Sequence, residues 1–259
     1  GLISIMKKPL SSDLLCPTKW VHFKFHIYST TKKFICQDIF NDIAPKYDLL
    51  NHLLSMNIDK GWRRKAMSCI GEQEKGCLLD VACGTGDFSI AAHRAGVKQV
   101  TGIDISENMV EIGKKKVGDL HLADAIELKT GDCEHMEFAT GMFDVVTVAF
   151  GVRNFEHLEL GLQEMYRVLK TGGKVIILEF SMPEHFPMKQ LYRFYFCHIL
   201  PTIGGWISGN KGAYTYLPES VMKFPQGETF LQIMRDCGFQ HPVRRKLSFG
   251  IASLYVGEK

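Results

Sequence analysis

Apolar and polar positions alternate in blocks along most of this chain. From about residue 77 onward, short apolar runs are separated by amphipathic stretches, as in successive βα units that build a parallel sheet. Apolar side chains recur at helical spacing over residues 158–169, and the glycines of residues 171–173 are predicted to end that helix. The runs predicted to form strands are residues 77–82, 99–104, 126–130, 143–150 and 174–180.

The C-terminal part predicts a different kind of strand pairing. Residues 238–247 and 251–256 resemble two further strands, and the short link between them predicts an antiparallel hairpin. The sheet therefore has about seven, mostly parallel, strands in a doubly wound α/β fold. Residues 181–235 are too long for a simple connection and are rich in aromatic side chains. We expect this insertion to recognise the substrate.

Composition is that of a soluble enzyme or binding domain. The chain has 259 residues, of which 46% are hydrophobic and 23% charged. A net charge of +3 and dispersed basic clusters do not indicate a nucleic-acid partner, and no apolar run of about 18 residues predicts a transmembrane helix. The eight cysteines form no C-x-x-C pair, which favours reduced thiols in the cytoplasm. No histidine or cysteine spacing suits a metal.

The first 33 residues are an N-terminal extension of unclear status. They begin with Gly rather than Met, contain six lysines, and lack a clean apolar core that ends in a cleavage site. A cloning remnant, an extended start and a targeting piece all stay open.

A glycine loop marks the candidate ligand site. Gly84, Thr85 and Gly86 directly follow the first predicted strand and precede a helical stretch, so the chain can turn tightly and approach a ligand closely. Ser89 stands where the dinucleotide fingerprint has its third glycine, which favours a ligand without a pyrophosphate. The alternative is a strand-to-helix turn that binds nothing.

Two carboxylates follow the next strands. Asp104 ends the second strand, where it can accept hydrogen bonds from both ribose hydroxyls of an adenosine. Ser106 is the better cap for the following helix, although a capping role for Asp104 is the alternative. Asp132 and Cys133 follow the third strand, where they can meet an adenine ring, or form only a turn with Gly131. These features converge on the carboxyl ends of the strands.

Six motifs carry a family resemblance: FNDIAPKYD at 40–48, WRR at 62–64, DVACGTGD at 80–87, FGVRN at 150–154, MYRVLK at 165–170 and YTYLPES at 214–220. Together they resemble the ubiquinone/menaquinone biosynthesis C-methyltransferases over about residues 34–259. The fourth motif and the YLPES part of the sixth are specific to that family rather than general to methyltransferases.

The resemblance implies a class I, Rossmann-like methyltransferase domain over residues 34–259. It implies transfer of a methyl group from S-adenosylmethionine to a ring carbon of a polyprenylated hydroquinone. Ala149 departs from some members, which carry a cofactor-contacting Ser there. Residues 213–221 look more like menaquinone-only members, so demethylmenaquinol is the preferred acceptor and the ubiquinone-pathway reaction the alternative. The expected cofactor residues are Asp80, Gly84, Thr85, Gly86, Asp104, Asp132 and Cys133.

Candidate catalytic residues follow the fourth strand and lie in the insertion. A hydroquinone carbon becomes nucleophilic when a ring hydroxyl loses its proton, so the site needs a base, a held water or a cation. Arg153 can stabilise the phenolate while Asn154 orients a hydroxyl, and Tyr216 can contact the ring. The alternatives are a loop-fixing pair for Arg153 and Asn154 and simple packing for Tyr216.

Other functions and partners stay open. A methyltransferase for another small molecule, or a cofactor-binding protein without turnover, would share the loop. An RNA substrate would need a basic, aromatic surface that the sequence lacks. Residues 186–207 combine aromatic and basic side chains, which suits either a peripheral membrane contact or a lid over an apolar pocket. A homodimer is compatible with the sequence but not indicated by it.

Overall fold

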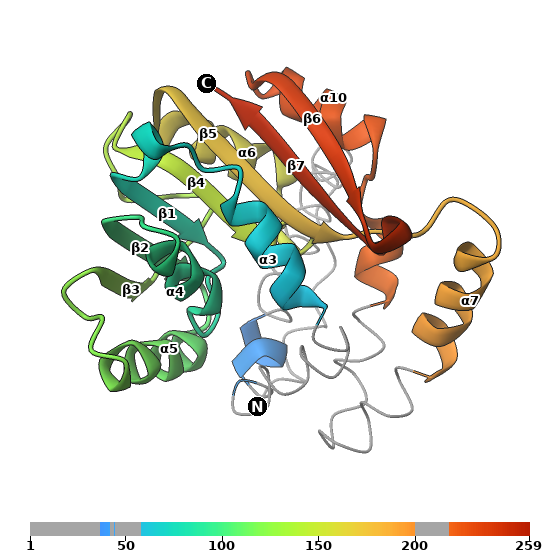
Figure 1. The fold of residues 1–259 in the computed structure, drawn as a ribbon, viewed down its shortest axis with the longest axis horizontal. Helices are drawn as coiled ribbons and strands as arrows, with labels where there is room; N and C mark the ends of the chain where they lie inside the picture. Colours follow the sequence, from blue (N-terminus) through green and yellow to red (C-terminus); the bar gives the residue numbers. More distant parts are fainter. Residues whose placement is uncertain (1–36, 42–43, 45–57, 200–217) are drawn as a thin grey trace, which may run out of the picture.

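The computed structural model describes residues 37–41, 44, 58–199 and 218–259, and its core is one seven-stranded sheet (Figure 1). The strands follow the order β3-β2-β1-β4-β5-β7-β6. Strands β1 to β5 pair in parallel, and β7 pairs antiparallel with both β5 and β6. Their bounds are β1 Cys77–Val81, β2 Gln99–Asp104, β3 Ile126–Thr130, β4 Phe143–Ala149, β5 Leu169–Phe180, β6 Gln240–Leu247 and β7 Ala252–Glu258.

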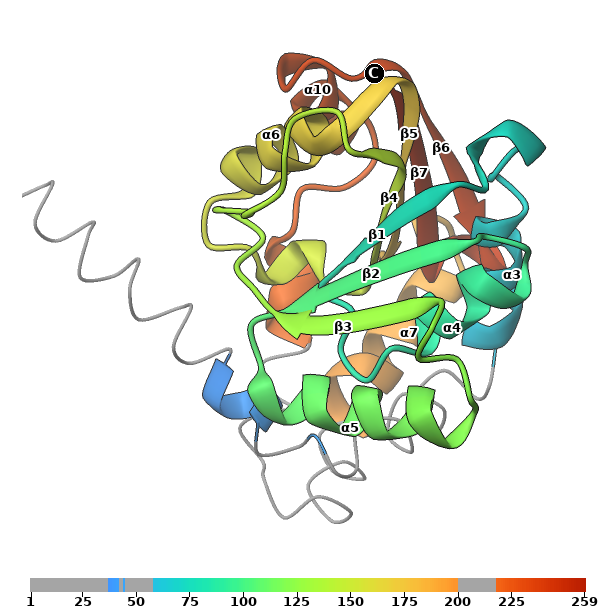
Figure 2. The ribbon, with the colours of Figure 1, turned by 90° about the vertical axis from the view of Figure 1, so that its left-hand side faces the viewer.

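Helices cover both faces of this sheet, as Figure 2 shows. Neighbouring strand residues point to opposite faces. Leu78 packs in one core cluster with side chains of α3, α4 and α5, and Leu79 packs in a second cluster with side chains of α6 and α10. The predicted α/β class and C-terminal hairpin are therefore confirmed. The helices are α3 Asp59–Met67, α4 Asp87–Arg94, α5 Glu107–Asp119, α6 Leu158–Val168, α7 Met188–Phe194 and α10 Glu228–Asp236, with short turns η3 Glu72–Glu74, η4 Val152–Asn154, η5 Tyr195–Ile199 and η6 Ser248–Gly250.

The predicted end of α6 is wrong. The helix stops at Val168, and Leu169 already has extended backbone and begins β5. Leu169 is fully buried and pairs with Phe143, so core packing draws it into the sheet. The glycines expected to end the helix instead bond to the C-terminus: Gly172 N–H donates to the Lys259 carbonyl at 2.7 Å, and Lys259 N–H donates to the Gly173 carbonyl at 3.0 Å.

The insertion after β5 is only partly within the described residues. Residues 181–199 include α7 and the π-helical turn η5, and the chain is described again from residue 218. Among the described helices, none is both long and apolar enough to cross a bilayer. The cysteines at positions 69, 77, 83, 133 and 237 are free thiols.

Candidate active site

A cavity lies at the carboxyl ends of four neighbouring parallel strands. Its wall includes Gly84 after β1, Asp104 at the end of β2, Asp132 after β3 and Asn154 after β4. The central pair β1 and β4 is where the strand order reverses, the position at which open α/β sheets bind ligands. The sequence predicted this convergence, and the structure brings these residues together.

The glycine loop needs its glycines. Gly84 and Gly86 have φ of 55° and 79°, in the left-handed region that favours glycine. A Cβ on Gly86 would come within 2.9 Å of the Leu128 side chain, which β3 contributes. The loop thus turns directly into α4 and leaves the Gly84 backbone on the cavity wall.

Two further predicted cofactor residues, Asp80 and Thr85, form hydrogen bonds within the protein. Asp80 is fully buried and accepts hydrogen bonds from Ser89 Oγ at 2.6 Å and Thr147 Oγ1 at 3.0 Å. Burial raises the pKa of Asp80 to about 6, although these two hydrogen bonds favour the charged form and lower it. Buried Thr85 accepts from Lys116 Nζ at 3.2 Å. Neither residue lines this cavity, but both line an adjoining hollow that shares Gly84, Ala149 and Phe150 with it. Their contact with the cofactor stays a prediction.

Asp104 connects the loop to the next helix. Its Oδ2 accepts from the Gly84 N–H and its Oδ1 from the Ser106 N–H, both at 2.9 Å. Burial is the largest influence on this carboxyl and raises its pKa, while the backbone donors oppose the shift. Ser106 Oγ caps α5 by accepting from the Met109 N–H at 3.2 Å, as expected. Each Asp104 oxygen has a second lone pair, so both can still accept from a ligand hydroxyl.

The turn after β3 presents Asp132 and Cys133 to the same cavity. Asp132 Oδ1 accepts from the Glu134 N–H at 3.0 Å, and its Oδ2 lies 3.4 Å from His135 Nδ1. Burial raises the pKa of the Cys133 thiol well above its ordinary value. Cys133 is therefore a neutral wall residue and not a thiolate nucleophile.

Arg153 follows β4, as expected, but its side chain is buried and paired. Its side chain is 6% exposed, and Nη1 forms an ion pair with Glu179 Oε1 at 2.7 Å. The guanidinium also donates to the Phe150 carbonyl and, through Nε, to Ser220 Oγ at 3.3 Å. These contacts match the loop-fixing alternative and turn Arg153 away from the cavity that Asn154 lines. The third catalytic candidate, Tyr216, lies outside the described residues.

Comparison with known proteins agrees with this geometry. The family model described as the ubiE/COQ5 methyltransferase family matches residues 28–259. This chain belongs to that family. It is accordingly an S-adenosylmethionine-dependent methyltransferase, and we call it the methyltransferase below.

Relatives and solved structures agree with this assignment. A demethylmenaquinone methyltransferase of Bacteroides fragilis is 46% identical over 86% of this chain and 91% of the relative. A ubiquinone/menaquinone biosynthesis C-methyltransferase UbiE of Geotalea daltonii is 48% identical over 86% of this chain and 95% of the relative. A SAM-dependent methyltransferase from Thermotoga maritima has the same fold, with a TM-score of 0.61 at 20% identity over 86% of this chain and 99% of that one.

The cavity fits S-adenosylmethionine in the chemistry of its wall. Asp104 and Asp132 offer carboxylate acceptors at the ends of adjacent strands, which suit ribose hydroxyls and an adenine amino group. Met109 and Phe155 supply apolar surface of the kind that packs against an adenine ring. The individual contacts remain predictions.

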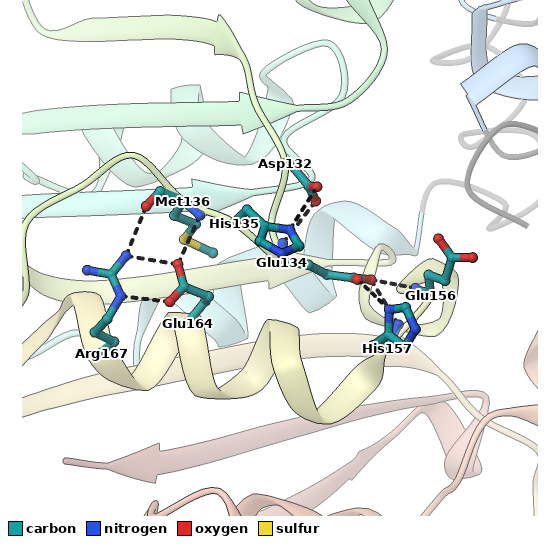
Figure 3. A network of polar contacts seen from close by, with 8 residues as sticks. All are labelled: Asp132, Glu134, His135, Met136, Glu156, His157, Glu164 and Arg167. Carbon is teal, nitrogen blue, oxygen red and sulfur yellow. Dashed lines mark hydrogen bonds and ion pairs between the residues drawn. The ribbon is translucent and has the colours of Figure 1, made fainter. Parts of the chain in front are cut away.

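Sequence reasoning missed part of the methyltransferase cavity. Glu134, Phe155 and Glu156 line it, and Ala149, noted as a family departure, lines it as well. A carboxylate two positions after Asp132 was the one available signal for Glu134. Nothing in the sequence shows that its side chain reaches the residues before α6, because those residues follow a different strand (Figure 3).

Proposed function

We propose that the methyltransferase methylates a ring carbon of a polyprenylated hydroquinone, with demethylmenaquinol as the acceptor. The observation that carries this proposal is the 46% identity to the demethylmenaquinone methyltransferase of Bacteroides fragilis over nearly the full length of both chains. Relatives named for both ubiquinone and menaquinone biosynthesis are equally similar. The ubiquinone-pathway C-methylation is therefore the second candidate.

The residues of the cavity supply position rather than covalent chemistry. Bound S-adenosylmethionine supplies an electrophilic methyl group on a sulfonium. Asn154 can orient a ring hydroxyl from the cavity wall, and Phe150 offers apolar surface for the ring. Arg153 holds the β4–α6 loop through Glu179 and so fixes Asn154, its neighbour. Holding reactants in a productive orientation can lower the activation free energy by about 7–11 kcal/mol, so positioning by these residues accounts for most of the catalysis.

The membrane contact rests on α7. Leu191 and Phe194 are 61% and 60% exposed, and Phe186 just before the helix is 80% exposed. Exposed Lys189 and Arg193 lie among them. Apolar and basic side chains on one short segment suit the surface of an anionic bilayer, where a prenylated acceptor resides.

The test is a methyl-transfer assay. The protein is incubated with radiolabelled S-adenosylmethionine and short-chain demethylated menaquinol or the corresponding ubiquinone precursor. We expect label in the menaquinone-type product and none with the same quinol already methylated at the target carbon. Label in the ubiquinone precursor alone would transfer the proposal to the second candidate, and label in neither quinol would refute both.

A further inference from the structure

One side chain joins the two loops that bound the cavity. Glu134, in the loop after β3, accepts through Oε1 from the N–H groups of Glu156 at 2.7 Å and His157 at 2.9 Å. Its Oε2 lies 2.8 Å from His157 Nδ1. Figure 3 shows this carboxylate reaching across to the start of α6. The loop after β4 is thus held from a neighbouring strand and not only by its own turn.

The contact is too complete to be incidental. Glu134 is 6% exposed, and a buried carboxylate is costly unless donors satisfy it. Here two backbone N–H groups and an imidazole nitrogen surround it. Those donors precede α6, so the carboxylate fixes the point at which the loop after β4 enters the helix. We call this loop, residues 150–157, the acceptor-side loop.

The position of the acceptor-side loop depends on these Glu134 contacts. Asn154 and Glu156 line the cavity, and the buried Oε1 of Glu156 has no hydrogen-bond partner among the described residues. The Glu156 side chain is therefore not anchored through that oxygen. Glu134 holds the backbone of Glu156 by accepting from its N–H, and this contact fixes where the side chain begins.

The other end of the connection belongs to the cofactor side. Asp132 accepts from the Glu134 N–H at 3.0 Å, and residues 132–134 all line the cavity. A ligand that contacts Asp132 or Cys133 therefore rests on the same short segment whose next side chain holds the opposite loop.

We propose that Glu134 is a positioning residue that couples cofactor binding to the acceptor-side loop. A ligand that fixes residues 132–134 orders residues 154–157 through the Glu134 carboxylate. The acceptor part of this proposal rests on the proposed function, whereas the coupling itself needs only the cofactor. Coupling between two sites by a factor of about 5–150 is typical.

The chain contains a matched control. Glu164 on α6 holds the same β3–β4 connection farther along, where its Oε2 accepts from the Met136 N–H at 2.9 Å, and it pairs with Arg167 at 2.7 Å (Figure 3). This second carboxylate also accepts a backbone N–H but does not line the cavity. Glu164→Ala therefore removes a comparable carboxylate–backbone hydrogen bond but leaves the Glu134 contacts with residues 156 and 157 in place.

The experiment measures hydrogen exchange in the peptide that contains residues 154–157, with and without S-adenosylhomocysteine. We expect the ligand to slow exchange about tenfold in the wild type and in Glu164→Ala, but not in Glu134→Ala at saturating ligand. Glu134→Gln should restore most of the effect, because its amide oxygen can still accept both backbone N–H groups. If Glu134→Ala does not fold, Glu134→Asp, whose side chain is shorter, takes its place.

Two results would overturn the proposal. The first is ligand-dependent slowing in Glu134→Ala as large as in the wild type, and the second is equal loss of slowing in Glu134→Ala and Glu164→Ala. A purely structural role would speed exchange equally with and without ligand and lower the melting temperature. With a quinol acceptor, Glu134→Ala should lower kcat about tenfold while the KM for S-adenosylmethionine changes less than about twofold. Absence of any quinol turnover in the wild type would reject the proposed function and leave the exchange result intact.

Discussion

The cofactor side and the acceptor side of the cavity are built in different ways. On the cofactor side, Gly84 and Asp104 lie at the ends of adjacent strands, and the Asp104 carboxylate accepts from the backbone N–H groups of Gly84, 20 positions away, and of Ser106. On the acceptor side, Arg153 pairs with Glu179, 26 positions away, and the loop before α6 is held by Glu134, which is 22 positions from Glu156. On the cofactor side, the carboxylate that holds the loop also lines the cavity, whereas the Arg153–Glu179 pair of the acceptor side is buried away from it.

This difference predicts how each side fails. A change on the cofactor side should lower ligand affinity more than stability, because Asp104 lines the cavity as well as holding the loop. A change on the acceptor side should lower both the stability of the protein and the order of residues 154–157, because it leaves a buried charge or several backbone N–H groups without a partner.

The largest expected effect is on cofactor affinity. Asp104→Ala removes the two hydrogen bonds expected from ribose hydroxyls, at about 1.5–3 kcal/mol each, and should raise the Kd for S-adenosylmethionine at least about 100-fold. Titration calorimetry measures this, with exposed Asp124→Ala as the control. Unchanged affinity in a folded Asp104→Ala protein would reject the ribose role.

The next effect is on stability. Glu179→Ala leaves the Arg153 guanidinium buried without its carboxylate, which should lower the free energy of unfolding by about 3–5 kcal/mol. Urea denaturation measures the change. The control is Glu111→Ala, which removes an exposed pair with Lys114 and should cost no more than about 1 kcal/mol. Equal losses in the two variants would show that the acceptor side has no special dependence on its buried pair.

The sequence could predict the features that local patterns encode, and these occur mostly on the cofactor side. The strands, the glycine turn and the Ser106 cap were predictable, because local patterns of two to four residues encode them. Tertiary pairing determined the rest. Leu169 fits the helical spacing but lies in β5, because it pairs with Phe143 of β4. The Arg153 side chain is buried because Glu179, in a separate strand, supplies a buried carboxylate. No local pattern could report either partner.

A smaller effect concerns the buried carboxyl of Asp80. The pKa of Asp80 is raised to about 6 from an ordinary 3.8, so between these values the folded protein binds a proton that the unfolded chain has released. This contribution to stability therefore rises as pH falls from neutral towards 4, and it amounts to about 3 kcal/mol over two pKa units. In Asp80→Asn this rise should be absent. Urea denaturation from pH 4 to 8 measures it, and parallel curves for the two proteins would contradict the prediction.

The smallest expected effect concerns the exposed side chains of α7. Leu191→Ser and Phe194→Ser remove exposed apolar surface from α7 without touching the core. If α7 enters a bilayer surface, each change should weaken binding to anionic vesicles by about 1 kcal/mol, or about fivefold, since partial burial of such a side chain contributes less than the 1.5–3 kcal/mol of full burial. Activity on a long-chain quinol should fall with it, while activity on a soluble short-chain analogue should not. Val243→Ser, on β6, removes a comparably exposed side chain from another element and should change neither activity. Equal losses on both quinols would instead assign α7 to the wall of the cavity, and the acceptor side would then end at a lid over an apolar pocket rather than at a membrane.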